Sequence, residues 1–261
     1  MPRAAATAGL LVSLSWAAAV TIPAAKCALR SALADNGGNS KAPAVVAAVD
    51  ALSSLCPFEA PTRESALLGK WQQINAPEYS GGTRDASGAF QYTLGRLSFG
   101  IFQPKDLMCT LGPILNPLKE SAVGGVIEYE IEIPFSIGRD NGPSLSAEII
   151  NFATCAVETD TRLSVSFSGG VMRPAEGCDR PAWREVFGPA LVAKPGKRVR
   201  VMNWLLRRLM GLIKPSQLGD DDAMSYQMTK APKGHLDVLY LDDELRITRG
   251  NRGSLVICER L

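Results

Sequence analysis

The sequence predicts a mainly β fold, in which an antiparallel sheet closes into a barrel or packs as a sandwich. Three observations predict it. Apolar and polar residues alternate along several segments after Trp71. These segments are separated by Gly, Pro and Asn residues. The hydrophobic content of 46% is enough for one full core. Closure removes the edges of a sheet, and about eight strands leave an interior that can hold one small ligand.

Residues 1–34 are expected to form a targeting leader, either disordered or helical. They carry three basic residues and no acidic residue, and an interrupted apolar stretch follows Arg3. This composition fits a secretory signal peptide, a plastid transit peptide or a two-part leader, and the alternative is a retained membrane anchor. Ala32-Leu33-Ala34 supplies a small-x-small cleavage signal, and the Gly/Asn/Ser-rich residues 35–42 then form a linker.

The predicted domain, residues 43–261, opens with one short amphipathic helix. Pro43 suits its first turn, apolar residues recur at helical spacing from Val45 to Leu55, and Pro57 ends it. Such a helix needs a surface on which to pack its apolar face.

Strands are predicted wherever the apolar period changes to two. In the clearest one, four apolar residues between Ile127 and Ile133 point to one side and three glutamates to the other, so one face meets an apolar interior and the other meets water. A phase slip at Gly95 indicates a bulge or a turn. The other expected strands cover residues 90–101, 145–157, 161–168, 238–248 and 254–260, the last two joined by a turn at 250–253.

A basic amphipathic helix is predicted near residues 199–213. The segment from Lys194 to Lys214 carries seven basic residues and no acid. This pattern is typical of a helix in an anionic lipid interface, and a helix that covers one end of the barrel is an alternative compatible with it. The apolar face comprises Met202, Leu205, Leu206, Leu209 and Ile213, and the candidate membrane-interface residues opposite are Trp204, Arg207 and Arg208.

Composition and motifs argue against several other classes of protein. The balance of 28 basic and 26 acidic residues gives no reason to expect nucleic acid as a partner. A single histidine, His235, and the lack of a CxxC pair argue against a zinc site, and neither GxSxG, GxGxxG nor a phosphate-binding loop occurs. We therefore expect no metal, no cofactor and no catalytic residue; an enzyme that uses Tyr129, Glu128 or His235 is the alternative.

Three segments resemble the plastid lipid-associated protein (PAP), or fibrillin, family. Residues 67–71, Leu-Leu-Gly-Lys-Trp, resemble its opening segment, which shares Gly-x-Trp with lipocalins, and residues 90–109 resemble its central strands. Residues 240–260, YLDDELRITRGNRGSLVICER, resemble its terminal signature of Tyr-Leu-Asp, two residues, Leu-Arg-Ile, and Arg-Gly before a hydrophobic strand. The resemblance covers about residues 43–261, with 170–232 matched poorly.

The resemblance implies a lipocalin-like antiparallel β-barrel, in which an arginine of a late strand, Arg246 or Arg249, lies over Trp71 in a cation–π contact. Asp242 is expected to order the backbone amides of its turn. The barrel-closure and signature residues are Gly69, Trp71, Asp242, Arg246, Arg249 and Gly250. The candidates for lining a ligand cavity, which otherwise form plain core, are Phe90, Tyr92, Phe99, Tyr129 and Phe167.

The resemblance also implies a non-enzymatic protein of the plastid, or chloroplast, at plastoglobules or thylakoids. Its expected partners are hydrophobic small molecules, such as isoprenoids, carotenoids, quinones or acyl lipids, and a peripheral membrane or lipid-body surface. The alternatives are a lipocalin-fold enzyme that acts on a hydrophobic plastid substrate and a protein that holds another protein. The sequence predicts neither the identity of the ligand nor the oligomeric state.

Overall fold

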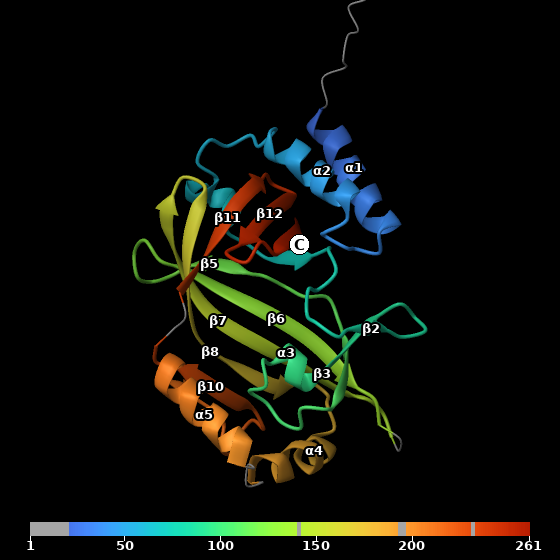
Figure 1. Cartoon of the computed structure of the whole chain (residues 1–261), viewed down its shortest axis with the longest axis vertical. Helices are drawn as coiled ribbons and strands as arrows, with labels where there is room; N and C mark the ends of the chain where they lie inside the picture. Colours follow the sequence, from blue (N-terminus) through green and yellow to red (C-terminus); the bar gives the residue numbers. More distant parts are fainter. Residues whose placement is uncertain (1–20, 140–141, 193–196, 231–232) are drawn as a thin grey trace, which may run out of the picture.

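Long antiparallel strands cross the middle of the molecule, and helices lie at both of its ends (Figure 1). The computed structural model describes residues 21–139, 142–192, 197–230 and 233–261. The apolar stretch of the expected leader before Val20, and Lys194 of the basic segment, lie outside the described residues.

The described helices are short. They are α1 (Ile22–Asp35), α2 (Pro43–Ser53), α3 (Leu94–Leu97), α4 (Arg180–Val192) and α5 (Lys197–Met210), with 3-10 turns at η1 (Pro61–Arg63) and η2 (Ser65–Leu67). The strands are β1 (Trp71–Gln73), β2 (Thr83–Arg84), β3 (Phe90–Thr93), β4 (Met108–Leu111), β5 (Leu118–Glu120), β6 (Ile127–Ile137), β7 (Leu145–Thr159), β8 (Arg162–Pro174), β9 (Leu212–Ile213), β10 (Met224–Met228), β11 (Lys233–Leu241), β12 (Leu245–Gly250) and β13 (Leu255–Arg260).

The mainly antiparallel β class is confirmed, but the sheet is not closed into a barrel. Its neighbouring strands run in the order β1-β13-β12-β11-β8-β7-β6-β4-β3-β2, so β1 and β2 are the two ends of the path. Strand β1 has only three residues. On its free side, isolated bridges join Gln72 to Leu115 and, just before the strand, Gly69 to Leu118. These bridges are too few to form a ladder, which is why the predicted closure fails at this point.

The three longest strands, β6, β7 and β8, form the centre of the sheet. Their alternation was visible in the sequence: Tyr129 and Ile133 of β6 are buried, whereas Glu128 is exposed. The predicted strands at 145–157 and 161–168 are confirmed, and both extend further than expected, to Thr159 and Pro174.

Strand β8 divides the sheet into two branches. Its first half, Arg162–Ser166, pairs with β11, while its second half, Gly169–Met172, pairs with β10. Gly169 has φ +158°, and a Cβ there would collide with the carbonyl group of Tyr226, so the close approach of β10 requires a glycine. The split sends β11–β13 toward α1 and α2, and β10 toward α4 and α5 (Figure 1).

Two predicted strands are wrong in part. The expected strand 238–248 is interrupted by the turn at Asp242, which separates β11 from β12. The expected strand 90–101 ends at Thr93, because residues 94–97 form α3 with Leu94 and Leu97 buried one helical turn apart. The expected turn between β12 and β13 is confirmed.

Helices α1 and α2 cover β11–β13 and form a core of their own with them. The helix expected at 43–56 is confirmed as α2, with Val45, Val49 and Leu52 buried. Helix α1 begins after the N-cap Thr21, and it buries Leu29 and Leu33 in the same core. The Ala32-Leu33-Ala34 cleavage signal therefore lies within a packed helix.

The expected linker, residues 35–42, includes the last residue of α1, and its remainder is a tight connection between α1 and α2. Gly37 and Gly38 adopt φ +59° and +79°, which favours glycine, and they end α1. The Gly38 carbonyl accepts a hydrogen bond of 2.8 Å from the Ala76 amide, so this connection is attached to the segment that follows β1.

Candidate functional site

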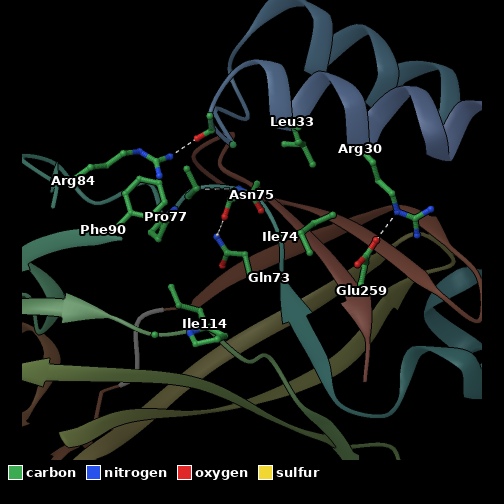
Figure 2. Close-up of a pocket in the computed structure, with 16 residues that line it drawn as sticks. Arg30, Leu33, Gln73, Ile74, Asn75, Pro77, Arg84, Phe90, Ile114 and Glu259 are labelled. Atoms are coloured by element: carbon green, nitrogen blue, oxygen red, sulfur yellow. Dashed lines mark hydrogen bonds and ion pairs between the residues drawn. The ribbon is translucent and has the colours of Figure 1, made fainter. Parts of the chain in front are cut away.

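An open cleft of about 580 Å³ lies between α1 and the sheet (Figure 2). Its walls are the end of α1 with the turn after it, the segment that follows β1, β3, residues 112–114 and β13. Most of the lining is apolar. The apolar side chains are Leu33, Ile74, Pro77, Phe90, Pro113 and Ile114.

Asn75 holds the segment after β1 in place beneath α1. This residue is 4% exposed. Its Nδ2 donates to the Leu255 carbonyl (3.0 Å), and its Oδ1 accepts from the Ile257 amide (2.9 Å). Both bonds tie the wall of the cleft to β13, so this wall is rigid.

Arg84 and Phe90 form one side of the cleft (Figure 2). The Arg84 guanidinium carbon lies 3.8 Å from the centre of the Phe90 ring, in cation–π geometry. Its Nη groups donate to the carbonyls of Gly37 (2.6 Å) and Gly88 (2.7 Å). The arginine therefore links the turn after α1 to the β2–β3 hairpin.

Arg30 and Glu259 form the other side. The Arg30 Nε atom donates to Glu259 Oε1 at 2.6 Å, and this ion pair joins α1 to β13. The hydrogen bond and the charge of Glu259 raise the pKa of Arg30. The charge of Arg30 is therefore neutralised within the cleft.

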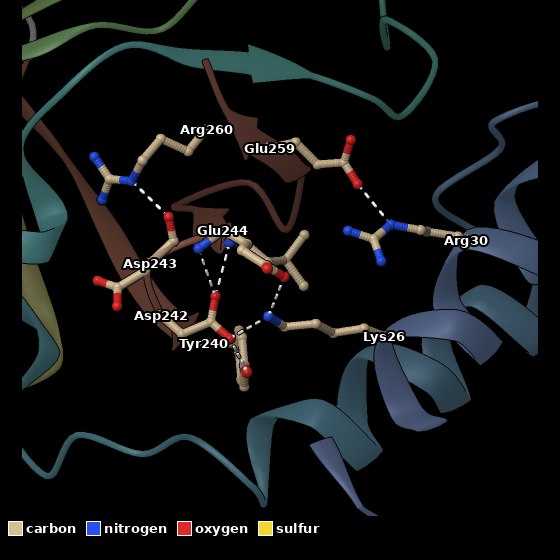
Figure 3. Close-up of polar contacts among 9 residues, drawn as sticks. Lys26, Arg30, Tyr240, Asp242, Asp243, Glu244, Glu259 and Arg260 are labelled. Carbon is tan, nitrogen blue, oxygen red and sulfur yellow. Dashed lines mark hydrogen bonds and ion pairs between the residues drawn. The ribbon is translucent and has the colours of Figure 1, made fainter. Parts of the chain in front are cut away.

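A second polar group connects α1 to the turn of the terminal signature, residues 240–260 (Figure 3). Lys26 Nζ lies 2.5 Å from Asp242 Oδ2 and 2.9 Å from Glu244 Oε2. Asp242 Oδ1 accepts from the amides of Glu244 (2.9 Å) and Leu245 (2.8 Å), and the Tyr240 hydroxyl donates to Oδ2 (2.5 Å). Asp242 thus orders its turn and binds Lys26 of α1.

The pKa of Asp242 reflects these contacts. Burial of the carboxyl group raises its pKa, but the hydrogen bonds from Lys26, Tyr240 and two amides outweigh burial and lower it. Burial likewise lowers the pKa of Lys26, and the hydrogen bonds and charges of Asp242 and Glu244 outweigh that effect and raise it. Both residues are therefore stabilised in their charged forms.

Trp71 is fully buried, and two arginines lie over its ring. The guanidinium carbons of Arg260 and Arg246 lie 4.2 and 5.0 Å from the centre of its ring. Arg260, which the sequence analysis missed, also donates to the carbonyls of Ala66, Leu68 (2.8 Å) and Asp243 (2.7 Å). Gly69 has φ +129°, and a Cβ there would collide with Arg260.

Arg246 is a buried cation among apolar side chains and is 2% exposed. Its Nη2 atom donates to the Asn116 carbonyl at 3.3 Å. Within the described part of the chain, its Nε and Nη1 atoms and Asn116 Nδ2 have no hydrogen-bond partner. Arg249 is only half-buried, pairs with Leu255 in the hairpin, and makes no cation–π contact in the described part; Gly250 pairs with Leu236.

Helix α5 exposes large apolar side chains to solvent. Val201 is 66% exposed, Trp204 62% and Leu209 63%, and Ile213 just after the helix is 50% exposed. Arg207 and Arg208 are also exposed, in the last turn of the helix. Of the described residues of the predicted apolar face, only Leu206 packs partly against the core. Gly211 (φ +62°) follows the last residue of the helix, which therefore ends before residue 213, the end expected from the sequence.

The PAP_fibrillin family model matches residues 140–259. This match, over just under half of the chain, supports membership of the PAP/fibrillin family. No curated protein and no solved structure matches it. The PAP/fibrillin family is associated with plastid lipids.

The PAP/fibrillin match spans β7 to β13 with α4 and α5. It therefore includes the exposed face of α5, the Asp242 turn and Arg246. Lys26 and Trp71, the partners of Asp242 and Arg246, come from earlier parts of the chain. Contacts between the matched and unmatched parts are tertiary, and so sequence motifs in one part alone did not indicate them.

The five aromatic residues predicted to line one cavity lie in different places. Phe90 alone lines the cleft. Tyr92 and Tyr129 are buried, and their hydroxyl groups donate to Pro77 O (3.0 Å) and Asn116 Oδ1 (2.9 Å). Phe167 is half-buried. The prediction for Phe99 is wrong, since φ +51° after α3 turns its ring outward and leaves it 77% exposed.

The structure adds two findings about metals and membranes for the described residues alone. They contain no group of three or more His, Cys, Asp or Glu side chains arranged to hold a metal ion. None of the helices in the described ranges is both long and apolar enough to cross a bilayer.

Proposed function

We propose that this PAP/fibrillin protein is a non-enzymatic, plastid lipid-associated protein that binds or organises hydrophobic molecules at the surface of plastoglobules or thylakoids. Isoprenoids, carotenoids, quinones and acyl lipids are the classes of ligand. The observation that carries the proposal is the exposed apolar and basic surface of α5 in a member of a lipid-associated family.

The chemistry of α5 supports attachment to a lipid surface. Water-exposed Val201, Trp204 and Leu209 cost free energy that burial in the boundary between headgroups and acyl chains would recover. Arg207 and Arg208 lie beside them and attract an anionic surface, at about 1 kcal/mol for each basic residue. The helix lies in the interface in this arrangement and does not cross the bilayer.

The cleft supports the binding of a hydrophobic molecule. Its volume is within the range of small-molecule sites, about 300–1,000 Å³, and its lining is mostly apolar. The described lining otherwise supplies amides, two arginines and one glutamate, a set suited to holding a ligand; Glu128, Tyr129 and His235 do not line it.

We also propose that the strands around Trp71 have a lipocalin-like arrangement, although the sheet is not closed. Residues 115–118 lie between β1 and β6, because Leu115 bridges both Gln72 and Glu132. The contacts of Arg246 and Arg260 with the Trp71 ring support the same likeness to lipocalins.

Flotation with vesicles tests the lipid-surface proposal. The double variant Arg207→Glu/Arg208→Glu should lower binding to galactolipid vesicles containing phosphatidylglycerol by at least about tenfold, since two attractive charges become repulsive. The double variant Trp204→Ala/Leu209→Ala should weaken binding to neutral vesicles too. A matched charge reversal on another surface, Arg63→Glu/Arg252→Glu, serves as the control.

Unchanged flotation of both α5 variants, or an equal loss in the control, would contradict docking through α5. Mass spectrometry of lipids that co-purify with the protein from plastids tests the non-enzymatic role. A carrier retains its lipid unchanged, whereas turnover of an added lipid would favour an enzyme.

A further inference from the structure

We propose that the cleft beside α1 binds a single-chain anionic amphiphile, such as a long-chain fatty carboxylate, with its head group at Arg84 and its chain beneath α1. This inference deepens the proposed function, on which it rests for the hydrophobic nature of the ligand. It concerns a site separate from α5.

The first step is the distribution of charge around the cleft. Arg30 is neutralised by Glu259, whereas Arg84 makes no ion pair with any residue that the structure describes. The cleft therefore has one neutral side and one side with an uncompensated positive charge (Figure 2). An anion is favoured at Arg84 and is opposed near Glu259, which fixes the direction of an amphiphile in the cleft.

The second step is the preorganisation of Arg84. Its two Nη groups are held by carbonyls of the turn after α1 and of the β2–β3 hairpin, and its guanidinium plane rests on Phe90. A side chain already fixed in this way loses little conformational entropy when a ligand binds. Its Nε–H makes no hydrogen bond within the described residues and is available for a carboxylate oxygen.

The third step is the surface available to the chain. Leu33 of α1 and Ile114 below it are each 5% exposed, Pro77 lies between them and Arg84, and Ile74 lies beneath Leu33 on the side of Glu259 (Figure 2). These side chains continue from the head-group end toward the Arg30–Glu259 pair. Each methylene group of an alkyl chain that the cleft buries would contribute about 0.8 kcal/mol.

The role of α1 follows from this geometry. Leu33, Ala34 and the turn at Gly37 supply one wall, so the site requires part of the segment that was expected to be a removable leader. A chain that begins at residue 35 would lack Leu33 and Ala34.

The test compares oleate with oleyl alcohol, which has the same chain and a neutral head, by displacement of a fluorescent fatty acid at concentrations below micelle formation. The wild-type protein should bind oleate about tenfold more tightly than oleyl alcohol, a difference of about 1.4 kcal/mol. Arg84→Gln should remove this preference, and Ala34→Phe, which fills the cleft, should weaken both ligands. Arg63→Gln is the matched control, because Arg63 is an exposed arginine outside the cleft.

The source of the amphiphile is separated by a second arm in which oleate is presented in neutral vesicles. A preference that depends on Arg84 in solution indicates uptake of the acid from water, and one seen only with vesicles indicates uptake from a lipid surface. Equal binding of the two ligands in both arms, or a preference retained in Arg84→Gln, would overturn the proposal. Arg207→Glu/Arg208→Glu should leave oleate binding in solution unchanged, so failure of α5 docking and failure of the cleft are distinguishable.

Discussion

Lys26 Nζ of α1 and Asp242 Oδ2 of the terminal signature lie 2.5 Å apart, and their side chains are only 10% and 17% exposed. This pair joins residues that are distant in sequence, and Glu244 adds a second carboxylate at 2.9 Å (Figure 3). These ion pairs thus attach a segment of leader-like composition to the folded domain.

Replacing Lys26 by Met should destabilise the protein by about 2 kcal/mol, because the change keeps the aliphatic stem but leaves Asp242 without its cation. The free energy of unfolding in urea, followed by tryptophan fluorescence, measures this. Lys41→Met is the control. Lys41 pairs with Glu78, but its side chain is 73% exposed, and so its loss should cost less than about 0.5 kcal/mol. Equal effects of the two variants would contradict a special role for Lys26.

Stability should also depend on pH through Asp242. Its pKa is lower in the folded protein than in the unfolded chain, so its contribution is present above the unfolded value, about 3.9, and is lost as the pH falls through the lower folded value. The difference in unfolding free energy between the wild type and Asp242→Asn should therefore be largest near neutral pH and shrink below about pH 4.

Urea titrations at several pH values measure that difference. Asp242→Asn should keep part of the acid sensitivity, because the Arg162 hydrogen bond also lowers the pKa of Asp237. Lys26 makes the opposite contribution at high pH: its pKa is raised, so its stabilisation is complete below the unfolded value and is lost as the pH rises through the folded value. A difference independent of pH would exclude this account of Asp242.

Removal of α1 should be costly. Leu29 and Leu33 are 0% and 5% exposed, and burying two leucines stabilises by about 3–6 kcal/mol. A chain without residues 1–34 should therefore lose several kcal/mol relative to a chain without residues 1–20, or fail to fold. Equal melting temperatures of the two shortened chains would show that α1 is not part of the fold.

The sequence predicted the elements whose signal is local. Alternation along 127–133 identified β6, helical spacing after Pro43 identified α2, and the glycines at 250–253 identified the last hairpin. It failed at residues 94–101, because Leu94 and Leu97 fit both a strand with a bulge and a helical turn. Only tertiary packing decides between them, and it also leaves Phe99 outside.

The candidate site was predicted less well than the fold, because its residues meet through long-range contacts. Asp242 and Trp71 were identified by motif, but their partners Lys26 and Arg260 carry no local signal. The four-residue spacing of Ala25, Leu29 and Leu33 indicated a buried helical face in α1. A composition typical of targeting segments masked that signal, since an Ala/Leu-rich stretch satisfies both patterns.

The last prediction concerns Gly69 and Arg260, which should be energetically coupled. In the wild type, Gly69→Ala should cost about 2–4 kcal/mol, because φ is +129° and the new Cβ collides with the Arg260 guanidinium that lies over Trp71. In an Arg260→Ala background the collision is gone, and the same change should cost only the backbone strain, about 1–3 kcal/mol.

A double-mutant cycle on the free energy of unfolding measures this coupling, which we expect to be at least about 1 kcal/mol. Arg252→Ala, in the exposed hairpin turn, replaces Arg260→Ala in a control cycle and should show additive effects. Additivity in the Gly69–Arg260 cycle as well would mean that Arg260 moves away at no cost. The glycine of the Gly-x-Trp motif would then be required for its backbone conformation alone, and not for the approach of the arginine to Trp71.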